Sequence, residues 1–119
     1  MSLRNTFFKT VFLFLCIAQS LIANAYTIDE YKEQIKEGGN SKAFMEMYVM
    51  GVGQGFNWAS GVSRKNKEKE IFCPPNNLKI NGALILSIVN DGFETTKLKG
   101  TSPLELYVLQ RLTFVFPCK

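Results

Sequence analysis

Apolar residues recur at helical spacing along this chain from residue 26 onward, in segments separated by glycine, proline and charged residues. The first segment runs from Thr27 to about Lys36. We expect Thr27 to cap its first turn, with Glu30 reaching back to the cap three residues later. Gly38-Gly39-Asn40 predicts its end, because glycine tolerates the left-handed turn that closes a helix. The pattern therefore predicts a short opening helix.

A longer helix is predicted from a Ser41 cap to about Ser63. Its glycines each weaken a helix by up to about 1 kcal/mol relative to alanine, so we expect a neighbouring backbone to pass close to them. They do not indicate a phosphate-binding loop, since the third glycine of the dinucleotide fingerprint, a preceding strand and a P-loop lysine are all missing. The expected buried stripe is Phe44, Tyr48, Gly51, Val52, Gly55 and Ala59, widened by Met47, Trp58 and Val62.

A third helix is predicted to begin near Leu78 or Lys79 and to end near Phe93, before Lys97. Pro74-Pro75-Asn76-Asn77 precedes it and forbids regular structure, because proline lacks a backbone donor and biases the residue before it away from helix. Its expected buried side includes Ile80, Ala83, Leu84 and Ile88. The β-branched run Ile85-Leu86-Ser87-Ile88-Val89 leaves a strand open as the alternative.

The last segment carries the clearest local signal, with Ser102 as a cap, Pro103 at the first helical position and Glu105 three residues after the cap. It predicts a helix that reaches Phe116. Apolar residues occupy two sides of this helix, so we expect it to be central or to pair with a second subunit. One side holds Leu104, Tyr107, Val108, Leu112, Val115 and Phe116, and the other holds Leu106 and Leu109. Together the segments predict an all-α, single-domain bundle of about four helices.

The first 25 residues have the pattern of an export signal. Arg4 and Lys9 precede the apolar residues 11–18, and Ala23-Asn24-Ala25 supplies small residues for cleavage after Ala25. The apolar run is shorter than the roughly 20 residues of a spanning helix. Bulky Leu15 before Cys16 argues against a lipid anchor. We therefore expect a signal peptide over residues 1–25 and a soluble periplasmic domain over residues 26–119, without a stable membrane anchor.

Removal of the leader leaves two cysteines, Cys73 and Cys118. In an oxidising compartment two such residues in a small exported domain favour a disulfide over two unrelated buried thiols. The bridge would close a loop of about 46 residues, which the chain-entropy treatment values at about 4 kcal/mol. We therefore expect the C-terminus to be tied to the middle of the chain.

Charge excludes one class of partner. The 14 Lys and Arg residues include Arg4 and Lys9, so the exported domain keeps 12 against 10 acidic residues. This balance, with both signs interleaved, is not typical of a nucleic-acid-binding protein. Residues 64–70 illustrate the interleaving and predict an exposed loop, either solvated or in contact with a partner. The run reads Arg64-Lys65-Asn66-Lys67-Glu68-Lys69-Glu70.

The residue inventory also argues against catalysis. The chain has no histidine, which removes the usual general base, the histidine-dependent triads and the commonest zinc ligand. Cys73 would have no imidazole to activate it as a nucleophile. Asp91 and Glu94 lie three residues apart but show no apolar pocket that would tune them as an acid and base pair. We therefore predict a binding protein that uses neither metal nor cofactor.

Several motifs give the chain a resemblance to the Rap/Tai family of type VI secretion amidase immunity proteins. The shared features are an aromatic helix with Tyr before Gly-Val, a Phe-Cys-x-Pro segment, a further helix and a terminal helix that ends in Phe-Pro-Cys. In this sequence they are Tyr48-Val49-Met50-Gly51-Val52, Phe72-Cys73-Pro74-Pro75, residues 78–93, and residues 104–116 followed by Pro117-Cys118. The resemblance covers residues 41–118.

This resemblance implies a periplasmic, disulfide-bonded helical protein, often a homodimer, that occludes the active site of a peptidoglycan amidase. The partner would be a cognate toxin delivered by neighbouring cells. Such a protein presents a loop or helix face to its toxin. Our candidates for the partner contact are Arg64, Lys65, Lys67 and Glu68 in the charged loop, with Trp58 and Phe56 as exposed anchors. Packing in the core is the alternative for Trp58.

Two other functions fit the same sequence. A periplasmic acid-stress chaperone is also small, helical and disulfide-linked, and it would expose apolar surface at low pH. An inhibitor of lysozyme-type hydrolases is the other alternative. A neighbouring gene for an amidase-like toxin would argue against that inhibitor.

Overall fold

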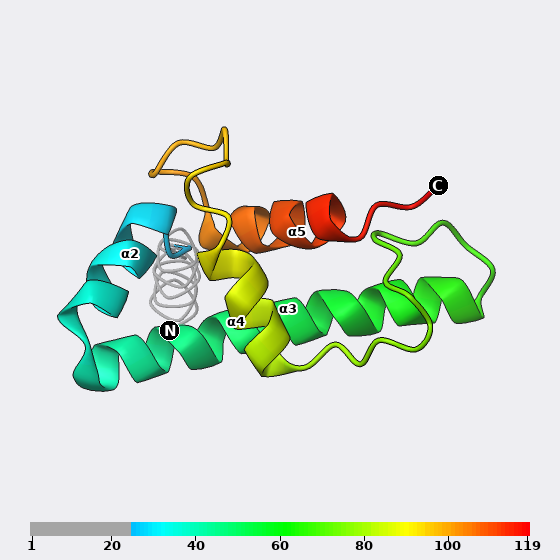
Figure 1. The fold of residues 1–119 in the computed structure, drawn as a ribbon, viewed down its shortest axis with the longest axis horizontal. Helices are drawn as coiled ribbons and strands as arrows, with labels where there is room; N and C mark the ends of the chain where they lie inside the picture. The colour runs from blue at the N-terminus through cyan, green and yellow to red at the C-terminus, as the bar shows by residue number, and fades with distance from the viewer. Residues whose placement is uncertain (1–24) are drawn as a thin grey trace, which may run out of the picture.

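The computed structural model describes residues 25–119, and these form four α-helices (Figure 1). The predicted all-α single domain with one disulfide is confirmed. The export signal falls on residues that lie, apart from Ala25, outside the described part of the chain. The helices are α2 (Ile28–Glu37), α3 (Gly39–Lys65), α4 (Gly82–Asn90) and α5 (Leu104–Val115).

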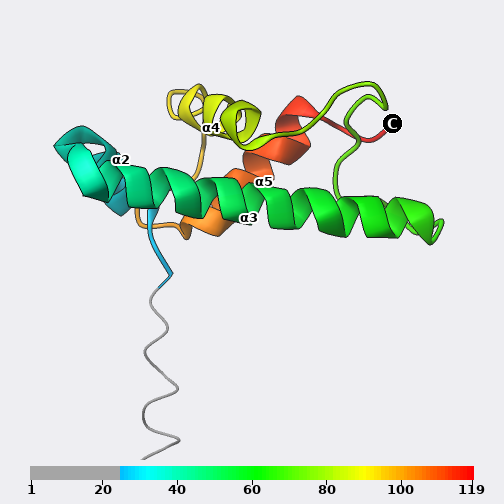
Figure 2. The same cartoon turned by 90° about the horizontal axis from the view of Figure 1, so that it is seen from below.

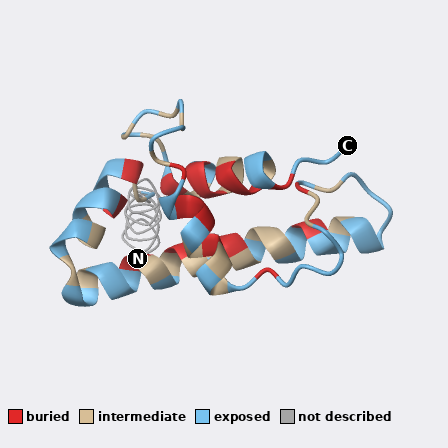
Figure 3. Ribbon diagram, in the orientation of Figure 1, coloured by how far each residue is buried: buried red, intermediate tan, exposed pale blue. Residues whose placement is uncertain are grey.

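Helix α3 is the longest of the four helices, and each of the other three packs against it. Figure 1 shows α2 folded back beside the start of α3, and α4 crossing between α3 and α5. Buried side chains line the surfaces where these helices meet (Figure 3). The largest fully buried residues are Tyr31, Tyr107 and Phe72. Both tyrosine hydroxyls are satisfied, since Tyr31 donates to Asn90 Oδ1 at 2.8 Å and Tyr107 donates to the Val89 carbonyl at 2.7 Å.

The start of α2 follows the prediction. The Thr27 hydroxyl accepts a hydrogen bond from the Glu30 amide at 3.2 Å, and the Glu30 carboxylate accepts one from the Thr27 amide at 2.7 Å. These bonds lower the pKa of Glu30, with the backbone bond from Thr27 as the larger cause. Reciprocal pairing of this kind satisfies donors that the first helical turn leaves free.

The boundary between α2 and α3 corrects one prediction. Helix α3 begins at Gly39, so Ser41 lies inside the helix and does not cap it. The predicted break over residues 38–40 contracts to Gly38 and Gly39, whose φ angles of 81° and 58° lie in the region that glycine adopts without strain. The Gly38 carbonyl then accepts from the Lys42 amide at 3.2 Å. Two consecutive glycines therefore turn the chain from one helix into the next.

The predicted buried stripe of α3 is wrong for most of its large residues. The helix buries Met45, Val49, Gly53 and Ser60 instead. Phe44, Met47, Trp58 and Val62 are 54%, 67%, 74% and 54% exposed. We call the surface row formed by Phe44, Met47, Gly51, Gly55, Trp58 and Val62 the outer stripe. At 100° per residue it lies on the side of α3 opposite the core, and in Figure 2 no other helix lies in front of α3.

The three glycines of α3 have different surroundings. A Cβ at Gly53 would lie 2.5 Å from Ile85 Cγ2 and 2.9 Å from Ile85 Cδ1, so a close neighbour is present there, but it is the Ile85 side chain and not the expected backbone. A Cβ at Gly51 or Gly55 would meet nothing within 4 Å. Packing within the described chain therefore explains Gly53 and leaves Gly51 and Gly55 without a reason.

Helix α4 is shorter than predicted and the strand alternative is wrong. The helix begins at Gly82, and Asn81 caps it by accepting from the Leu84 amide at 2.9 Å. Residues 78–80 stay outside because the Leu78 amide closes a turn onto the Pro75 carbonyl at 2.9 Å. At the other end the chain turns at Asp91, so Phe93 lies beyond the helix.

Helix α5 begins at Leu104, with Pro103 rather than Ser102 at the cap position and no side-chain cap bond. The predicted capping box is therefore wrong. The entry to the helix is instead held by the N-terminal segment, because the Leu104 amide donates to the Tyr26 carbonyl at 2.7 Å. The Ile28 amide likewise donates to the Ser102 carbonyl at 3.2 Å. Glu105 accepts a hydrogen bond from the Tyr48 hydroxyl and so joins α5 to α3.

Candidate partner-binding surface

The predicted disulfide joins Cys73 to Cys118, with an S–S distance of 2.00 Å and Cα atoms 4.9 Å apart. Neighbouring contacts reinforce this connection. The Cys73 amide donates to the Phe116 carbonyl at 2.8 Å, and the Phe72 and Phe116 rings lie 6.4 Å apart. The C-terminal segment is thus fixed to the chain that leaves α3.

A second attachment holds the segment around Phe72 to α3. The buried Ser60 hydroxyl donates to the Phe72 carbonyl at 2.8 Å and accepts from the Phe72 amide at 3.4 Å. Because a buried backbone amide or carbonyl is costly without a partner, this serine satisfies two groups at once. No pattern in the sequence indicates this role, since a serine within a helix usually faces solvent or bonds its own helix.

Residues 64–70, which we call the tip loop, form a closed turn at the end of α3. The Lys67 amide donates to the Arg64 carbonyl at 3.1 Å, and the Glu68 amide donates to the Ser63 carbonyl at 2.9 Å. These two bonds define a Schellman motif, in which the turning residue is usually glycine. Here that residue is Lys67, with a φ of 59°. An exposed lysine therefore holds a backbone conformation that costs a side chain about 1–2 kcal/mol.

One ion pair closes the tip loop. The Arg64 guanidinium lies 2.7 Å from the Glu70 carboxylate. The hydrogen bond from Arg64 lowers the pKa of Glu70, so the pair stays charged in mildly acidic solution. Lys65, Lys67, Glu68 and Lys69 are exposed around it. The loop predicted from the alternating charges is thus present, with a fixed backbone.

A groove lies beside the tip loop, between the end of α3 and the segment after Cys73. Its volume is about 320 Å³. Its charged lining residues, Arg64 and Lys79, are both cationic. Arg64 is already paired with Glu70, so Lys79 is the cation of the groove that an acidic group on a partner would complement. The remaining lining residues are Asn57, Trp58, Ser60, Gly61, Pro74, Pro75, Asn76, Leu78 and Ile80.

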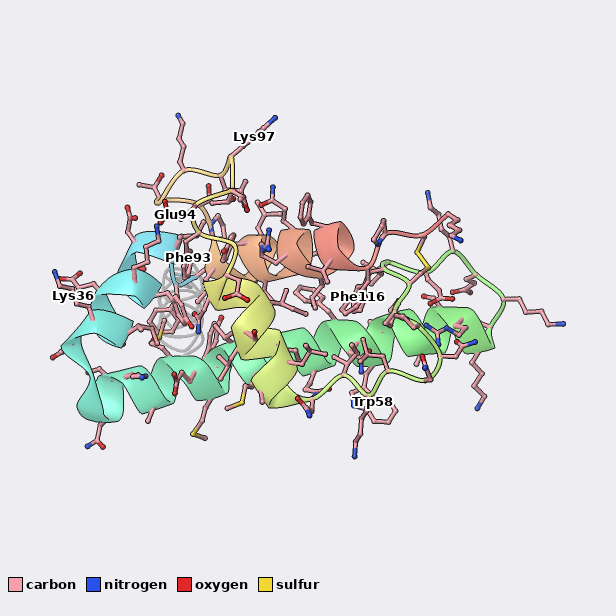
Figure 4. All side chains as sticks on the ribbon, viewed as in Figure 1. Lys36, Trp58, Phe93, Glu94, Lys97 and Phe116 are labelled. Carbon is pink, nitrogen blue, oxygen red and sulfur yellow. A yellow bond between two sulfur atoms is a disulfide. The ribbon has the colours of Figure 1, made fainter. Side chains whose placement is uncertain are left out.

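The two predicted aromatic anchors have different environments. Trp58 is 74% exposed at the edge of the groove, so the core alternative for this residue is wrong (Figure 4). Phe56 is half-buried and packs against the core, so its ring serves the fold more than the surface. The structure thus brings Trp58 close to Arg64 in one groove and places Phe56 on the inner side of α3.

A second hollow of about 280 Å³ lies against α5, and Arg111 forms part of its wall. The Arg111 side chain is buried, and its Nε donates to the Ile88 carbonyl at 3.2 Å. Ile88 belongs to the last turn of α4, where a cation is stabilised by the free carbonyls and the helix dipole. The arginine is therefore accounted for by its structural role. The lining residues are Thr95, Thr96, Lys97, Gln110, Arg111 and Phe114.

Asp91 and Glu94 are exposed, and Asp91 accepts from the Ser87 hydroxyl at 3.3 Å. No cluster of three potential metal ligands occurs among the described residues. The described surface presents cations, a groove and the exposed indole of Trp58.

The helices of residues 25–119 include none with both the length and the apolar character needed to cross a bilayer. The fold and the surface define a small, disulfide-bonded, all-α domain with a cationic groove at one end. Comparisons with protein-family models, with curated proteins and with solved structures find no match for this chain.

Proposed function

We propose that this protein is a periplasmic immunity protein that binds a peptidoglycan amidase effector of a type VI secretion system and occludes its active site. The motif resemblance supports the class of protein, and the tip loop supports the mode of binding. The observation that carries the proposal is Lys67, an exposed cation in a left-handed conformation at the end of the longest helix.

Backbone strain of this kind supports a binding role. Glycine at residue 67 would relieve the strain, so a lysine at this position costs the fold stability. Strained residues cluster at ligand-binding positions, where the surrounding structure holds them in place. Here Arg64–Glu70, the Ser60 bonds and the disulfide supply that support.

The proposed mechanism is steric. The end of α3 and the fixed tip loop enter the cleft of the amidase, so little conformational entropy is lost on binding. Lys65 and Lys67 pair with acidic groups at the cleft, and the groove receives a side chain from the cleft wall. Interfaces of this kind take most of their affinity from a few such anchors.

The test is titration calorimetry of the leaderless protein, residues 26–119, with a peptidoglycan amidase effector of a type VI secretion system, taken from a neighbouring gene where one is found, combined with an assay of peptidoglycan hydrolysis. We expect stoichiometric binding and loss of hydrolysis. Reversing two anchors with Lys65→Glu and Lys67→Glu should weaken binding by about 700-fold, because two anchors that each contribute about 2 kcal/mol together contribute about 4 kcal/mol.

The matched control carries the same change of charge at two positions outside the proposed partner-binding surface. Lys36 and Lys97 are exposed and lie away from Trp58 and the groove that it borders (Figure 4). Lys36→Glu combined with Lys97→Glu should leave affinity within a few-fold. Absence of binding and of inhibition by the unmodified protein would overturn the proposal. Inhibition of a lysozyme-type hydrolase in place of the amidase would assign the alternative function.

A further inference from the structure

The hollow against α5 has a wall that is cationic and rich in hydrogen-bond donors. Its charged lining residues, Lys97 and Arg111, are both positive, and the remaining polar ones are two threonines and Gln110. It shares no lining residue with the groove beside the tip loop. A concave site with a few polar groups is typical of small-ligand binding, and this charge favours an anion.

The Arg111 guanidinium is fixed in the wall of this hollow. The residue is only 8% exposed, and its Cζ atom lies 5.1 Å from the centre of the Phe114 ring. A Cβ at Gly92 would overlap Arg111 Nε, so the side chain packs directly against the Gly92 backbone. Because the guanidinium is already ordered, a ligand that binds it loses little affinity to side-chain entropy.

The structural role of Arg111 uses two of its three nitrogen atoms. Nε donates to the Ile88 carbonyl at 3.2 Å, and Nη1 donates to the Thr95 hydroxyl at 3.3 Å. Within residues 25–119, Nη2 has no acceptor and the guanidinium forms no ion pair with a carboxylate. No buried side-chain nitrogen of the described chain lacks a partner, so Nη2 opens into the hollow. A buried cation of this kind gains from an anion at its free nitrogen.

Gln110 supplies a second donor beside the first. Its Oε1 accepts from the Thr96 hydroxyl at 2.9 Å, which leaves the amide nitrogen Nε2 without an acceptor among the described residues. Gln110 directly precedes Arg111 on α5, and both residues line the hollow. Two donors on adjacent side chains match the two oxygens of a carboxylate. A phosphate presents more acceptor oxygens than these two groups can satisfy.

The Phe114 ring gives the same hollow an apolar edge. The residue is 69% exposed although it lines the hollow, so much of its ring is free to cover a ligand. An aromatic face beside polar donors suits a ligand with an apolar group next to its acid group. The volume of about 280 Å³ limits that ligand to a small molecule or to the last residue of a peptide.

We propose that this hollow binds a small carboxylate. The carboxyl group accepts hydrogen bonds from Arg111 Nη2 and Gln110 Nε2, and the adjacent apolar group packs on the Phe114 ring. A free organic acid and the C-terminal residue of a peptide present this same chemistry. The inference does not depend on the proposed amidase target.

The test is an NMR titration of the isotope-labelled leaderless protein with N-acetylalanine, with N-acetylalaninamide as the matched ligand that lacks the carboxylate. We expect saturable shifts of the Arg111 Nε–H and Gln110 side-chain signals in the millimolar range, because so small a ligand makes few contacts. The amide should bind at least about 10-fold more weakly. Isobutyrate distinguishes the two sources: equal affinity assigns a free acid, and tighter binding of N-acetylalanine assigns a peptide C-terminus.

Gln110→Glu is the informative variant. Glutamate still accepts from the Thr96 hydroxyl, so the fold is kept, but it replaces the free donor with a carboxylate beside the guanidinium. We expect N-acetylalanine to bind at least about 10-fold more weakly. The matched control is Gln34→Glu, the same change at a half-buried glutamine of α2 that does not line the hollow. It should leave the dissociation constant unchanged.

Three outcomes would overturn the inference. They are the absence of shifts at the hollow with either carboxylate, equal affinities for N-acetylalanine and its amide, and equal dissociation constants for the two glutamine variants. The titration contains no amidase, so its failure is separate from failure of the proposed function.

Discussion

Ser60 and Phe72 are joined in both directions, because the serine hydroxyl donates to the phenylalanine carbonyl and accepts from its amide. The pair connects the end of α3 to the residue that precedes Cys73. Through it, the tip loop is attached at both of its ends to the same helix. The stability of this short segment therefore decides how rigidly the proposed contact surface is held.

Ser60→Ala should lower the free energy of unfolding by about 1–3 kcal/mol, because two buried backbone groups lose their partner. Urea denaturation with the disulfide intact measures the change. Ser63→Ala is the control, since Ser63 is only partly buried on the same helix. Equal stabilities for the two variants would contradict the role assigned to Ser60.

Replacing Cys73 and Cys118 together by serine should lower the free energy of unfolding by about 4 kcal/mol, because the unfolded chain regains the freedom of a loop of about 46 residues. A urea titration of the variant beside the unmodified protein gives the difference. Mass spectrometry of the intact protein should show two fewer hydrogens than the reduced form. Free thiols in protein purified from an oxidising compartment would contradict this prediction.

Gly53→Ala should destabilise the domain, because the added Cβ would lie 2.5 Å from Ile85 Cγ2 and overpacking costs about 1–3 kcal/mol. Gly51→Ala should instead stabilise the domain by up to about 1 kcal/mol through helix propensity. Thermal unfolding of both variants beside the unmodified protein compares them. The prediction fails if both variants shift the midpoint in the same direction.

Lys67→Gly should raise the free energy of unfolding by about 1 kcal/mol, because glycine adopts the φ of 59° without strain. The same variant should bind the amidase less tightly, since it removes a proposed anchor. Chemical denaturation and calorimetry give the two values on one sample. A variant that gained stability and kept full affinity would remove Lys67 from the contact.

Alkaline pH should unfold the domain through its tyrosines. A hydrogen bond to Glu105 and partial burial raise the pKa of Tyr48 from 10.0 to about 12. Burial raises the pKa of Tyr31 and Tyr107 to about 12 as well. The neutral hydroxyls are favoured in the folded state, so their stabilisation is complete below about pH 10 and is lost as pH rises through about 12.

Urea midpoints measured from about pH 9 to about pH 12 test this dependence. Tyr48→Phe removes one of the shifted hydroxyls, so the decline in its free energy of unfolding should be shallower. If the free energy of unfolding of the variant fell as steeply with pH as that of the unmodified protein, Tyr48 would not contribute to the pH dependence.

The sequence predicted the presence of the helices better than it predicted which side of each helix is buried. Thr27 and Glu30 formed the expected cap because the signal is local, involving residues three apart. The buried side of α3 could not be read from its pattern, since the helix carries apolar residues on two opposite sides. Met45 and Val49 face the core only because α4 and α5 lie there. The choice between two apolar sides is made by the rest of the fold.

The predicted starts of the helices were wrong where more than one residue could act as the cap. Ser102 is a good cap by type, yet the segment at Tyr26 and Ile28 takes the backbone groups around it, and this depends on residues far away in sequence. Helix α4 is capped by Asn81 and does not begin near Lys79 as expected, because the turn that Leu78 closes onto Pro75 keeps residues 78–80 outside the helix. At the candidate site, the charged loop and the disulfide were predictable. The strain at Lys67 and the bonds of Ser60 could not be predicted, because they depend on how distant parts of the chain pack together.

If the predicted leader is cleaved after Ala25, the hydrogen bond from the Leu104 amide to the Tyr26 carbonyl bears on when that cleavage takes place. The predicted processing point directly precedes Tyr26, and the folded domain engages that residue in its own backbone pairing. A leader peptidase needs the same stretch as an extended, accessible substrate. We therefore expect the peptidase to act while the last helix is still undocked, so that a chain which folds early during translocation would retain its leader.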